Sequence, residues 1–88
     1  MKNKRLIIDV REPKEFESGH VKGAINIPPA RLLAGAKELK DTPKDTELIL
    51  YCKTGSRSNV SMQFLKLQGF TNLVNGINAD HVNKNYMS

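Results

Sequence analysis

The sequence predicts an α/β fold in which a parallel sheet of four or five short strands carries helices on both faces. Short apolar runs alternate with helical patterns along the 88 residues, and this alternation is typical of parallel sheets. The runs that read as strands are residues 6–10, 24–27, 47–51 and 70–74. A chain of this length supports one hydrophobic core, so we expect a single domain spanning residues 1–88.

The first strand and the segment after it follow from simple patterns. Residues 6–10 are apolar and β-branched, which suits a buried parallel strand. Residues 12–17 predict one helical turn, with Pro13 at its first position and Phe16 packed inward. The alternating run 24–27 predicts the second strand.

The middle of the chain predicts one more helix and the central strand. The helix starts at Pro28-Pro29, and its apolar face is expected to consist of Leu32, Leu33, Ala36 and Leu39. Residues 41–46 are rich in turn formers and predict a loop. The apolar run 47–51 then predicts a strand that leads directly into the only cysteine, Cys52.

The last third predicts a helix, a strand and a short terminal helix. The first helix begins at Arg57 or Ser58 and ends before Gly69. Its apolar residues follow helical spacing and are Val60, Phe64, Leu65 and Leu67. Residues 70–74 predict the last strand and Asn75-Gly76 a turn. The expected terminal helix packs through Ile77, Val82 and Tyr86, and His81 is expected at the surface.

Cys52 is expected at the carboxyl end of a buried strand, in a loop that opens into a helix. Ligands bind at this edge of open α/β sheets. The helix N-terminus and the flanking cations Lys53 and Arg57 favour the thiolate. The short polar residues Thr54, Gly55, Ser56 and Ser58 allow backbone N–H groups to turn inward as an anion-binding nest. We therefore predict a reactive thiolate in a small anion cup, although a lone cysteine can also be an inert core residue.

Two stretches resemble the rhodanese-type sulfurtransferases. The loop Cys52-Lys53-Thr54-Gly55-Ser56-Arg57-Ser58 is similar to the family's Cys-x-x-Gly-x-Arg-Ser loop. Upstream, Asp9-Val10-Arg11-Glu12-Pro13, then Glu15-Phe16, then residues 19–28 resemble the family's other signature in order and spacing. The compact size is most similar to single-domain rhodaneses of the phage shock protein E type. The chain departs from many rhodaneses in having Asn75-Gly76 and no tryptophan where they have Gly-Gly and a nearby tryptophan.

The resemblance implies a small rhodanese-like fold and a thiosulfate sulfurtransferase that needs no cofactor. Cys52 would take the sulfane sulfur of thiosulfate as a persulfide and pass it to a thiophilic acceptor such as cyanide or a thiol. Lys53, Thr54, Gly55, Ser56, Arg57 and Ser58 would bind the anionic substrate. Lys53 stands where many thiosulfate-preferring enzymes carry arginine, which predicts modest affinity for thiosulfate because lysine lacks the bidentate fork.

Three alternatives remain open from the sequence. A sulfur-relay protein that passes sulfur to a protein thiol would have the same loop. Related phosphatases and arsenate reductases use Cys-x5-Arg, whereas Cys52 and Arg57 are separated by four residues, and the shorter loop suits a single charged sulfur. A binding module without catalysis is the third alternative, because fold alone does not dictate function.

Three further polar residues, Asp9, Arg11 and His20, could have a role near Cys52. Asp9 and Arg11 are expected to support the Cys52 loop, and we hypothesise an ion pair between Asp9 and Arg57. His20 could act as a base beside the thiolate. A structural role for His20 is the better interpretation, because a loop that already holds a thiolate needs no base.

Composition narrows the classes of partner and location. The net charge is +5, but basic residues form no long run and do not alternate with aromatic residues, so we expect no nucleic-acid partner. No apolar run approaches the roughly 20 residues of a membrane span, and no Cys/His cluster has metal-site spacing. We expect a monomer. The basic start at residues 1–5 precedes too short an apolar run for a signal peptide, which predicts a cytoplasmic protein, or a periplasmic one if a leader was removed.

Overall fold

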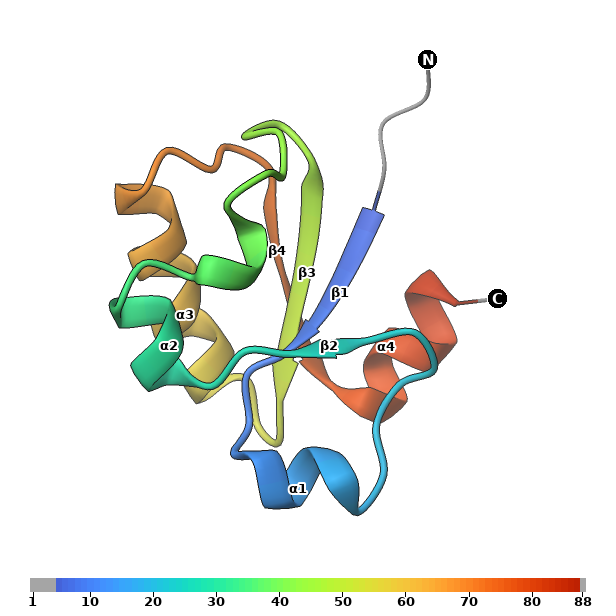
Figure 1. Cartoon of the computed structure of the whole chain (residues 1–88). Helices are drawn as coiled ribbons and strands as arrows, with labels where there is room; N and C mark the ends of the chain where they lie inside the picture. Colours follow the sequence, from blue (N-terminus) through green and yellow to red (C-terminus); the bar gives the residue numbers. More distant parts are fainter. Residues whose placement is uncertain (1–4, 88) are drawn as a thin grey trace.

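The computed structural model describes residues 5–87, and within them the chain forms a parallel sheet of four strands in the order β2-β1-β3-β4 (Figure 1). The strands are β1 (Arg5–Asp9), β2 (Ile25–Asn26), β3 (Glu47–Cys52) and β4 (Leu73–Asn78). The helices are α1 (Pro13–Glu17), α2 (Pro29–Leu33), α3 (Ser56–Leu67) and α4 (Ala79–Tyr86), with a 3-10 helix η1 (Lys37–Leu39). This confirms the predicted α/β class and the four parallel strands. The basic start at residues 1–4 lies outside the described part.

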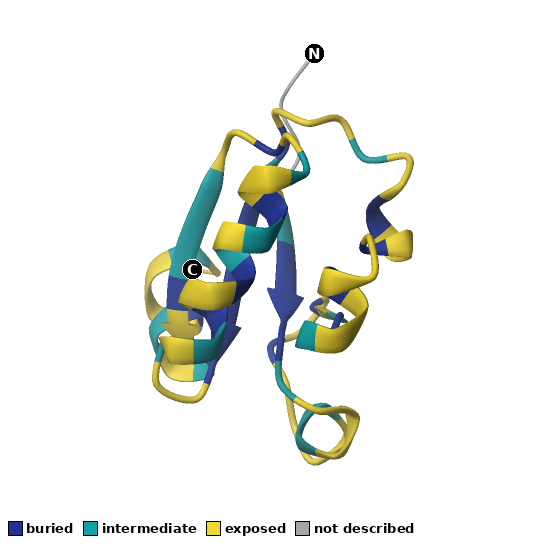
Figure 2. Ribbon diagram, turned by 90° about the vertical axis from the view of Figure 1, so that its left-hand side faces the viewer, coloured by how far each residue is buried: buried dark blue, intermediate teal, exposed yellow. Residues whose placement is uncertain are grey.

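The central strand β3 divides the core into two halves, because successive side chains point to opposite faces of a sheet. Leu48, Leu50 and Cys52 belong to the larger cluster, which α2 and α3 cover. Ile49 and Tyr51 belong to the smaller cluster, which includes Val82 of α4. Figure 1 shows α2 and α3 on one side of the strands and α4 on the other. In Figure 2 the buried residues concentrate on the strands and the exposed residues on the outer helix surfaces.

The strand order places a crevice beside β3. After β1 the chain moves outward to β2, and it then returns past β1 to form β3 and β4. The direction of winding therefore changes between β1 and β3. Ligands bind at such a switch point, outside the carboxyl ends of the strands. Cys52 ends β3 at this edge, and α1 lies just beyond it (Figure 1).

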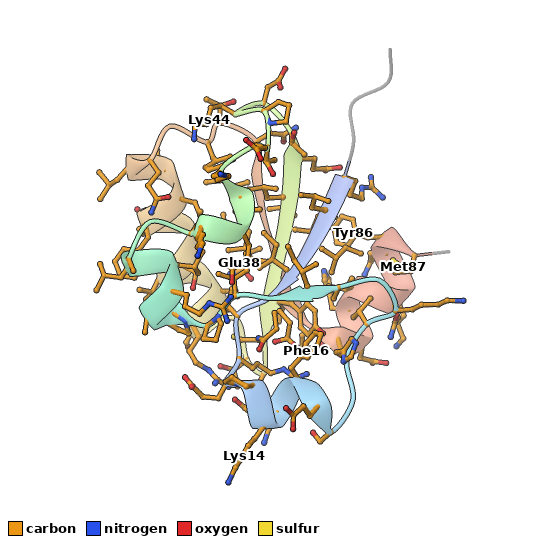
Figure 3. The ribbon with its side chains drawn as sticks, viewed as in Figure 1. Lys14, Phe16, Glu38, Lys44, Tyr86 and Met87 are labelled. Carbon is orange, nitrogen blue, oxygen red and sulfur yellow. The ribbon has the colours of Figure 1, made fainter. Side chains whose placement is uncertain are left out.

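Helix α1 packs through one aromatic side chain. Pro13 occupies its first turn, where a missing N–H costs nothing. Phe16 is partly buried against the smaller cluster. Figure 3 shows Phe16 directed toward the rest of the protein and Lys14 directed away from it. The predicted position of Pro13 and the inward packing of Phe16 are confirmed.

The helix predicted from Pro28-Pro29 to Leu39 is interrupted. Helix α2 ends at Leu33, whose side chain is 68% exposed, so Leu33 is not part of the core. Ala36 adopts a left-handed backbone with φ of 50° and is buried, and η1 begins immediately after it. This turn redirects the chain so that Leu39 reaches the core from η1 rather than from α2.

The buried face of α3 matches the predicted one only in part: Leu65 is buried and Phe64 packs against the larger cluster, as expected. Its buried residues are Ser58, Ser61 and Leu65, whereas Val60 is 50% and Leu67 86% exposed. Small serines let a helix approach a sheet closely, and the Ser61 hydroxyl is satisfied by the Arg57 carbonyl at 2.8 Å. The side of α3 that faces the sheet therefore decides which of its residues are buried, even where the apolar spacing predicts otherwise. The predicted helix end is confirmed, since Gly69 follows the helix with φ of 102°.

Strand β4 occupies residues 73–78 instead of the predicted 70–74. Asn75-Gly76 is not a turn but part of this strand, where a bulge leaves Gly76 unpaired: Leu50 pairs with Asn75, and Tyr51 pairs with Ile77. A Cβ atom on Gly76 would lie 2.6 Å from a Val82 methyl, so the close packing of α4 requires glycine there. The predicted terminal helix is confirmed as α4, although Ile77 precedes it.

Candidate active site

A cavity of about 440 Å³ lies at the carboxyl edge of the sheet and contains Cys52 in its lining. The loop after β1, helix α1, the loop after β3 and the start of α4 each contribute to it. The lining residues are Arg11, Glu15, Ser18, Cys52, Lys53, Asn78, Ala79 and Asp80. A second hollow of about 450 Å³ lies elsewhere, around the C-terminal part of α3, and Lys66 is the charged residue in its lining. Cys52 therefore identifies the first cavity as the candidate site.

The Cys52 side chain is almost fully buried, and hydrogen-bond donors surround its sulfur. The residue is 2% exposed. The Gly55 N–H donates to Sγ at 3.1 Å, and the Ser58 hydroxyl lies 3.7 Å from it. Burial alone raises the pKa of the thiol, but the amides of Ser58, Thr54 and Gly55 and the Ser58 hydroxyl outweigh it and lower the pKa to about 7. A substantial thiolate fraction is therefore present at neutral pH.

The local sequence explains how these donors reach the sulfur. Gly55 has φ of 96°, a left-handed conformation that most side chains resist, and it stands immediately before α3. This turn brings the first N–H groups of α3 back toward Cys52. The positive end of the helix macrodipole stabilises an anion at the same position. The loop turns N–H groups inward as expected, and α3 starts at Ser56, one residue earlier than predicted.

The other predicted loop residues point in different directions. Lys53 lines the cavity and is exposed, as are Thr54 and Ser56 at the outer side of the loop. Ser58 is fully buried. Arg57 turns toward α1 and donates both terminal nitrogens to the Glu15 carboxylate, at 2.7 and 3.1 Å. The ion pair with Arg57 holds the pKa of Glu15 at about 2.

The hypothesised ion pair between Asp9 and Arg57 is wrong. Asp9 is fully buried and pairs with Arg11, whose Nε and one terminal nitrogen contact both carboxylate oxygens at 2.7–3.1 Å. The Tyr51 hydroxyl also donates to Asp9, at 3.0 Å, and accepts the Val21 N–H at 3.0 Å. Asp9 therefore pairs with Arg11 and not with Arg57. It also binds Tyr51, the residue just before Cys52, and we call Asp9, Arg11 and Tyr51 the buried polar frame.

Arg11 and His20 both make contacts that support the segment between β1 and β2. Arg11 donates to the Gly19 carbonyl at 2.7 Å and also reaches the cavity lining. His20 stacks on Phe16 with ring centroids 3.6 Å apart, and its Nδ1 lies 2.7 Å from the Phe16 carbonyl oxygen. These contacts match the structural interpretation of His20 and give it no part in the cavity lining.

Several cavity and loop residues were not predicted from the sequence. Asn78, Ala79 and Asp80 line the cavity because β4 ends at Asn78, four residues later than expected. Asn75 contacts the Cys52 loop from β4, with its Nδ2 donating to the Gly55 carbonyl at 3.1 Å. Asparagine is disfavoured in strands, and a polar residue near the carboxyl end of the last strand is the signal that could have identified it.

Two general searches give results for the described residues alone. Residues 5–87 hold no cluster of three or more His, Cys, Asp or Glu side chains able to bind a metal ion. The helices in this part of the chain are all too short or too polar to cross a membrane.

The site belongs to an α/β protein with a buried thiol at the carboxyl end of a central parallel strand, next to the N-terminus of the following helix. Residues 1–79 match the model of the rhodanese-like domain. The chain therefore belongs to the rhodanese-like domain family, and the resemblance seen in its two motifs is confirmed.

Named relatives and a solved structure agree with this assignment. The chain is 42% identical over 72 residues to the uncharacterized protein YqhL of Bacillus subtilis, covering 82% of this chain and 55% of YqhL. It is 35% identical over 72 residues to the thiosulfate sulfurtransferase PspE of Escherichia coli, covering 77% of this chain and 64% of PspE. It thus spans little more than half the length of these relatives. A solved rhodanese with anions from E. coli superposes with a TM-score of 0.78 at 28% identity, covering 88% of this chain and 89% of that structure.

Proposed function

We propose that this protein is a sulfurtransferase that carries the sulfane sulfur of thiosulfate on Cys52 to a thiophilic acceptor. The observation that carries the proposal is the position of the Cys52 sulfur, which accepts the Gly55 N–H at 3.1 Å and belongs to a residue that lines the cavity. A thiol pKa of about 7 supports the role of nucleophile. Family membership and the likeness to PspE supply the sulfur chemistry.

The proposed reaction is a double displacement. The Cys52 thiolate attacks the outer sulfur of thiosulfate, a new S–S bond forms, and the original S–S bond breaks as sulfite leaves with its electron pair. The protein now carries a persulfide on Cys52. An acceptor such as cyanide attacks the terminal sulfur, the S–S bond of the persulfide breaks, and thiocyanate leaves as the Cys52 thiolate returns.

Each loop residue has a proposed part in this cycle. The N–H groups of Thr54, Gly55 and Ser58 stabilise the negative charge, which rests on Sγ before transfer and on the persulfide after it. Lys53 attracts the anionic donor from the cavity wall. Arg57 is engaged with Glu15, so its proposed role is to hold the loop against α1 as well as to supply positive charge. Ser56, on the outer side of the loop, contributes its place in the first turn of α3.

Sulfur relay to a protein thiol is a second candidate, and the charged residues at the exposed edge of the cavity support it. Lys53 and Asp80 are both exposed and both line the cavity, so oppositely charged groups are available for contact with a partner. The persulfide chemistry on Cys52 is the same in both cases. Only the acceptor differs, and the transfer of labelled sulfur from the persulfide to reduced protein thiols, compared with transfer to cyanide, distinguishes the two.

Intact-mass measurement before and after incubation with thiosulfate, followed by cyanide, tests the proposal. We expect a gain of one sulfur atom, its loss to cyanide with release of thiocyanate, and neither change in Cys52→Ser. Lys66→Ala, a change in the second hollow, is the matched control and should load sulfur normally. Absence of sulfur gain in a folded wild-type protein, with thiosulfate and with other persulfide donors, would refute sulfur transfer at Cys52.

A further inference from the structure

Asn75 is the residue of β4 that links three parts of the candidate site. Its Nδ2 donates to the Gly55 carbonyl at 3.1 Å, and its Oδ1 accepts the Ile77 N–H at 2.9 Å. The same Oδ1 lies 2.6 Å from the Ser58 hydroxyl oxygen. One amide side chain therefore contacts the Cys52 loop, the strained Ile77 with φ of 71°, and the first turn of α3.

The two backbone partners determine which way the Asn75 amide faces. A carbonyl can only accept, so the Gly55 contact requires the NH₂ group, and an N–H can only donate, so the Ile77 contact requires Oδ1. Oδ1 cannot donate to Ser58. The short contact of 2.6 Å therefore requires that the Ser58 hydroxyl donates to Asn75.

Ser58 has one hydroxyl proton and two competing uses for it. While Cys52 is a thiol, its S–H can donate to the Ser58 oxygen, 3.7 Å away, and the Ser58 proton remains on Asn75. A thiolate cannot donate. To stabilise it, the Ser58 hydroxyl must rotate toward Sγ and give up the bond to Asn75.

We propose that Asn75 is a positioning residue that competes with the Cys52 thiolate for the Ser58 hydroxyl proton. This competition reduces the fraction of Cys52 that is present as thiolate. The inference rests on the proposed function only in assigning Cys52 as the nucleophile, and it concerns ionisation rather than sulfur transfer. The Gly55 carbonyl, 3.1 Å from the Ser58 oxygen, is a weaker competitor because the contact is longer and the Asn59 N–H already donates to that carbonyl.

Other charged groups also face the thiol and act as a constant background. Arg11 follows β1, Glu15 lies on α1, Lys53 lies in the loop and Asp80 lies on α4, and all four line the cavity. Arg57 of α3 also interacts electrostatically with Cys52. A change of Asn75 to an uncharged residue alters none of these charges, so a shift in Cys52 ionisation then reports on hydrogen bonding.

The test measures the rate of Cys52 alkylation by iodoacetamide across pH about 5 to 10. Cys52 is the only cysteine, so the signal has one source. In Asn75→Ala the Ser58 proton becomes available to the thiolate. We expect the midpoint to fall by about half a unit to one unit, equivalent to about three- to tenfold more thiolate at a pH below the midpoint.

The Ser58→Ala background separates competition from simple support of the loop. Without the Ser58 hydroxyl, adding Asn75→Ala should leave the alkylation midpoint where Ser58→Ala alone puts it. Asn72→Ala changes an exposed asparagine immediately before β4; it is the matched control and should behave like the wild type. If Asn75→Ala does not fold, Asn75→Val carries the same expectation, because valine also lacks a hydrogen-bonding side chain and favours a strand.

A midpoint that rises or stays constant in the Asn75 variant, or an equal shift with and without Ser58, would show that Asn75 only holds the loop in place and would overturn the proposal. Because the readout is alkylation, it does not depend on thiosulfate. A failure of sulfur loading in the mass experiment leaves this test intact, and failure of this test leaves sulfur loading intact.

Discussion

Tyr51 and Cys52 are neighbours at the end of β3, yet they serve two differently built halves of the protein. Tyr51 points to the smaller cluster, where its hydroxyl joins Asp9 and the Val21 N–H in a closed network with Arg11. Cys52 points to the larger cluster, and its sulfur is surrounded by N–H groups of the following loop. One half is held by buried side chains, and the other is shaped by backbone amides.

The two halves differ in whether they contain a group that titrates near neutral pH. The carboxylate of Asp9 accepts bonds from Arg11 and Tyr51, and burial raises the pKa of Tyr51 to about 12, so the Tyr51 hydroxyl keeps its proton at neutral pH. The Cys52 thiol titrates at about 7 instead. The buried polar frame on one face of the sheet and a titrating group on the other should respond separately to mutation.

Asp9→Asn should give the largest effect on stability. The new NH₂ group would face donors of Arg11, and the Arg11 guanidinium would lose the carboxylate that neutralises it. We expect the free energy of unfolding to fall by about 2–4 kcal/mol, measured by urea denaturation. In the fraction that remains folded, the midpoint of Cys52 alkylation should stay near 7. A large shift of that midpoint would show that the two halves are coupled.

Tyr51→Phe should give a smaller loss of stability. It removes the hydroxyl that accepts the Val21 N–H and donates to Asp9, which leaves a buried N–H without its partner. We expect a loss of about 1–2 kcal/mol in thermal or urea unfolding. Thiosulfate loading of Cys52 should continue at the wild-type level, and a strong reduction in loading would contradict the separation of the halves.

The ion pair between Glu15 and Arg57 should give the smallest effect, because it is partly exposed to solvent. The pKa of Glu15 is lowered to about 2, so the pair stabilises the folded state above the ordinary glutamate value and loses this contribution as pH falls toward 2. An NMR titration of the Glu15 carboxyl carbon should have its midpoint near 2 in the wild type. In Arg57→Ala the midpoint should return toward about 4.3, and an unchanged midpoint would refute the pairing.

Local sequence rules predicted the centre of the site well. Cys52 at the end of a buried strand, the inward turn of the N–H groups in its loop and a helix start within a residue or two of Ser56 all depend on contacts between near neighbours. The same rules failed where distant segments meet. Arg57 pairs with Glu15, 42 residues earlier, and no local pattern favours Glu15 over Asp9 as its partner.

The C-terminal third shows the same limit in another form. Asn75-Gly76 resembles a turn because both residues favour turns. The close approach of Val82 to Gly76 makes the pair a strand bulge instead, and this places Asn75 against Gly55 and Ser58. The apolar spacing on α3 was right for Leu65 and wrong for Leu67, because Ser58 and Ser61 take places on the buried face while Leu67 faces solvent.

The sequence by itself determined the α/β alternation, the rhodanese-like motifs and the thiol at the carboxyl end of its strand. These depend on periodicity, turn chemistry and helix starts, which are properties of short segments. Only the tertiary structure decided which cation neutralises Asp9, which side chains line the cavity and which acceptor receives the Ser58 proton. Those choices depend on distances between segments that are far apart in the chain, and no local pattern encodes them.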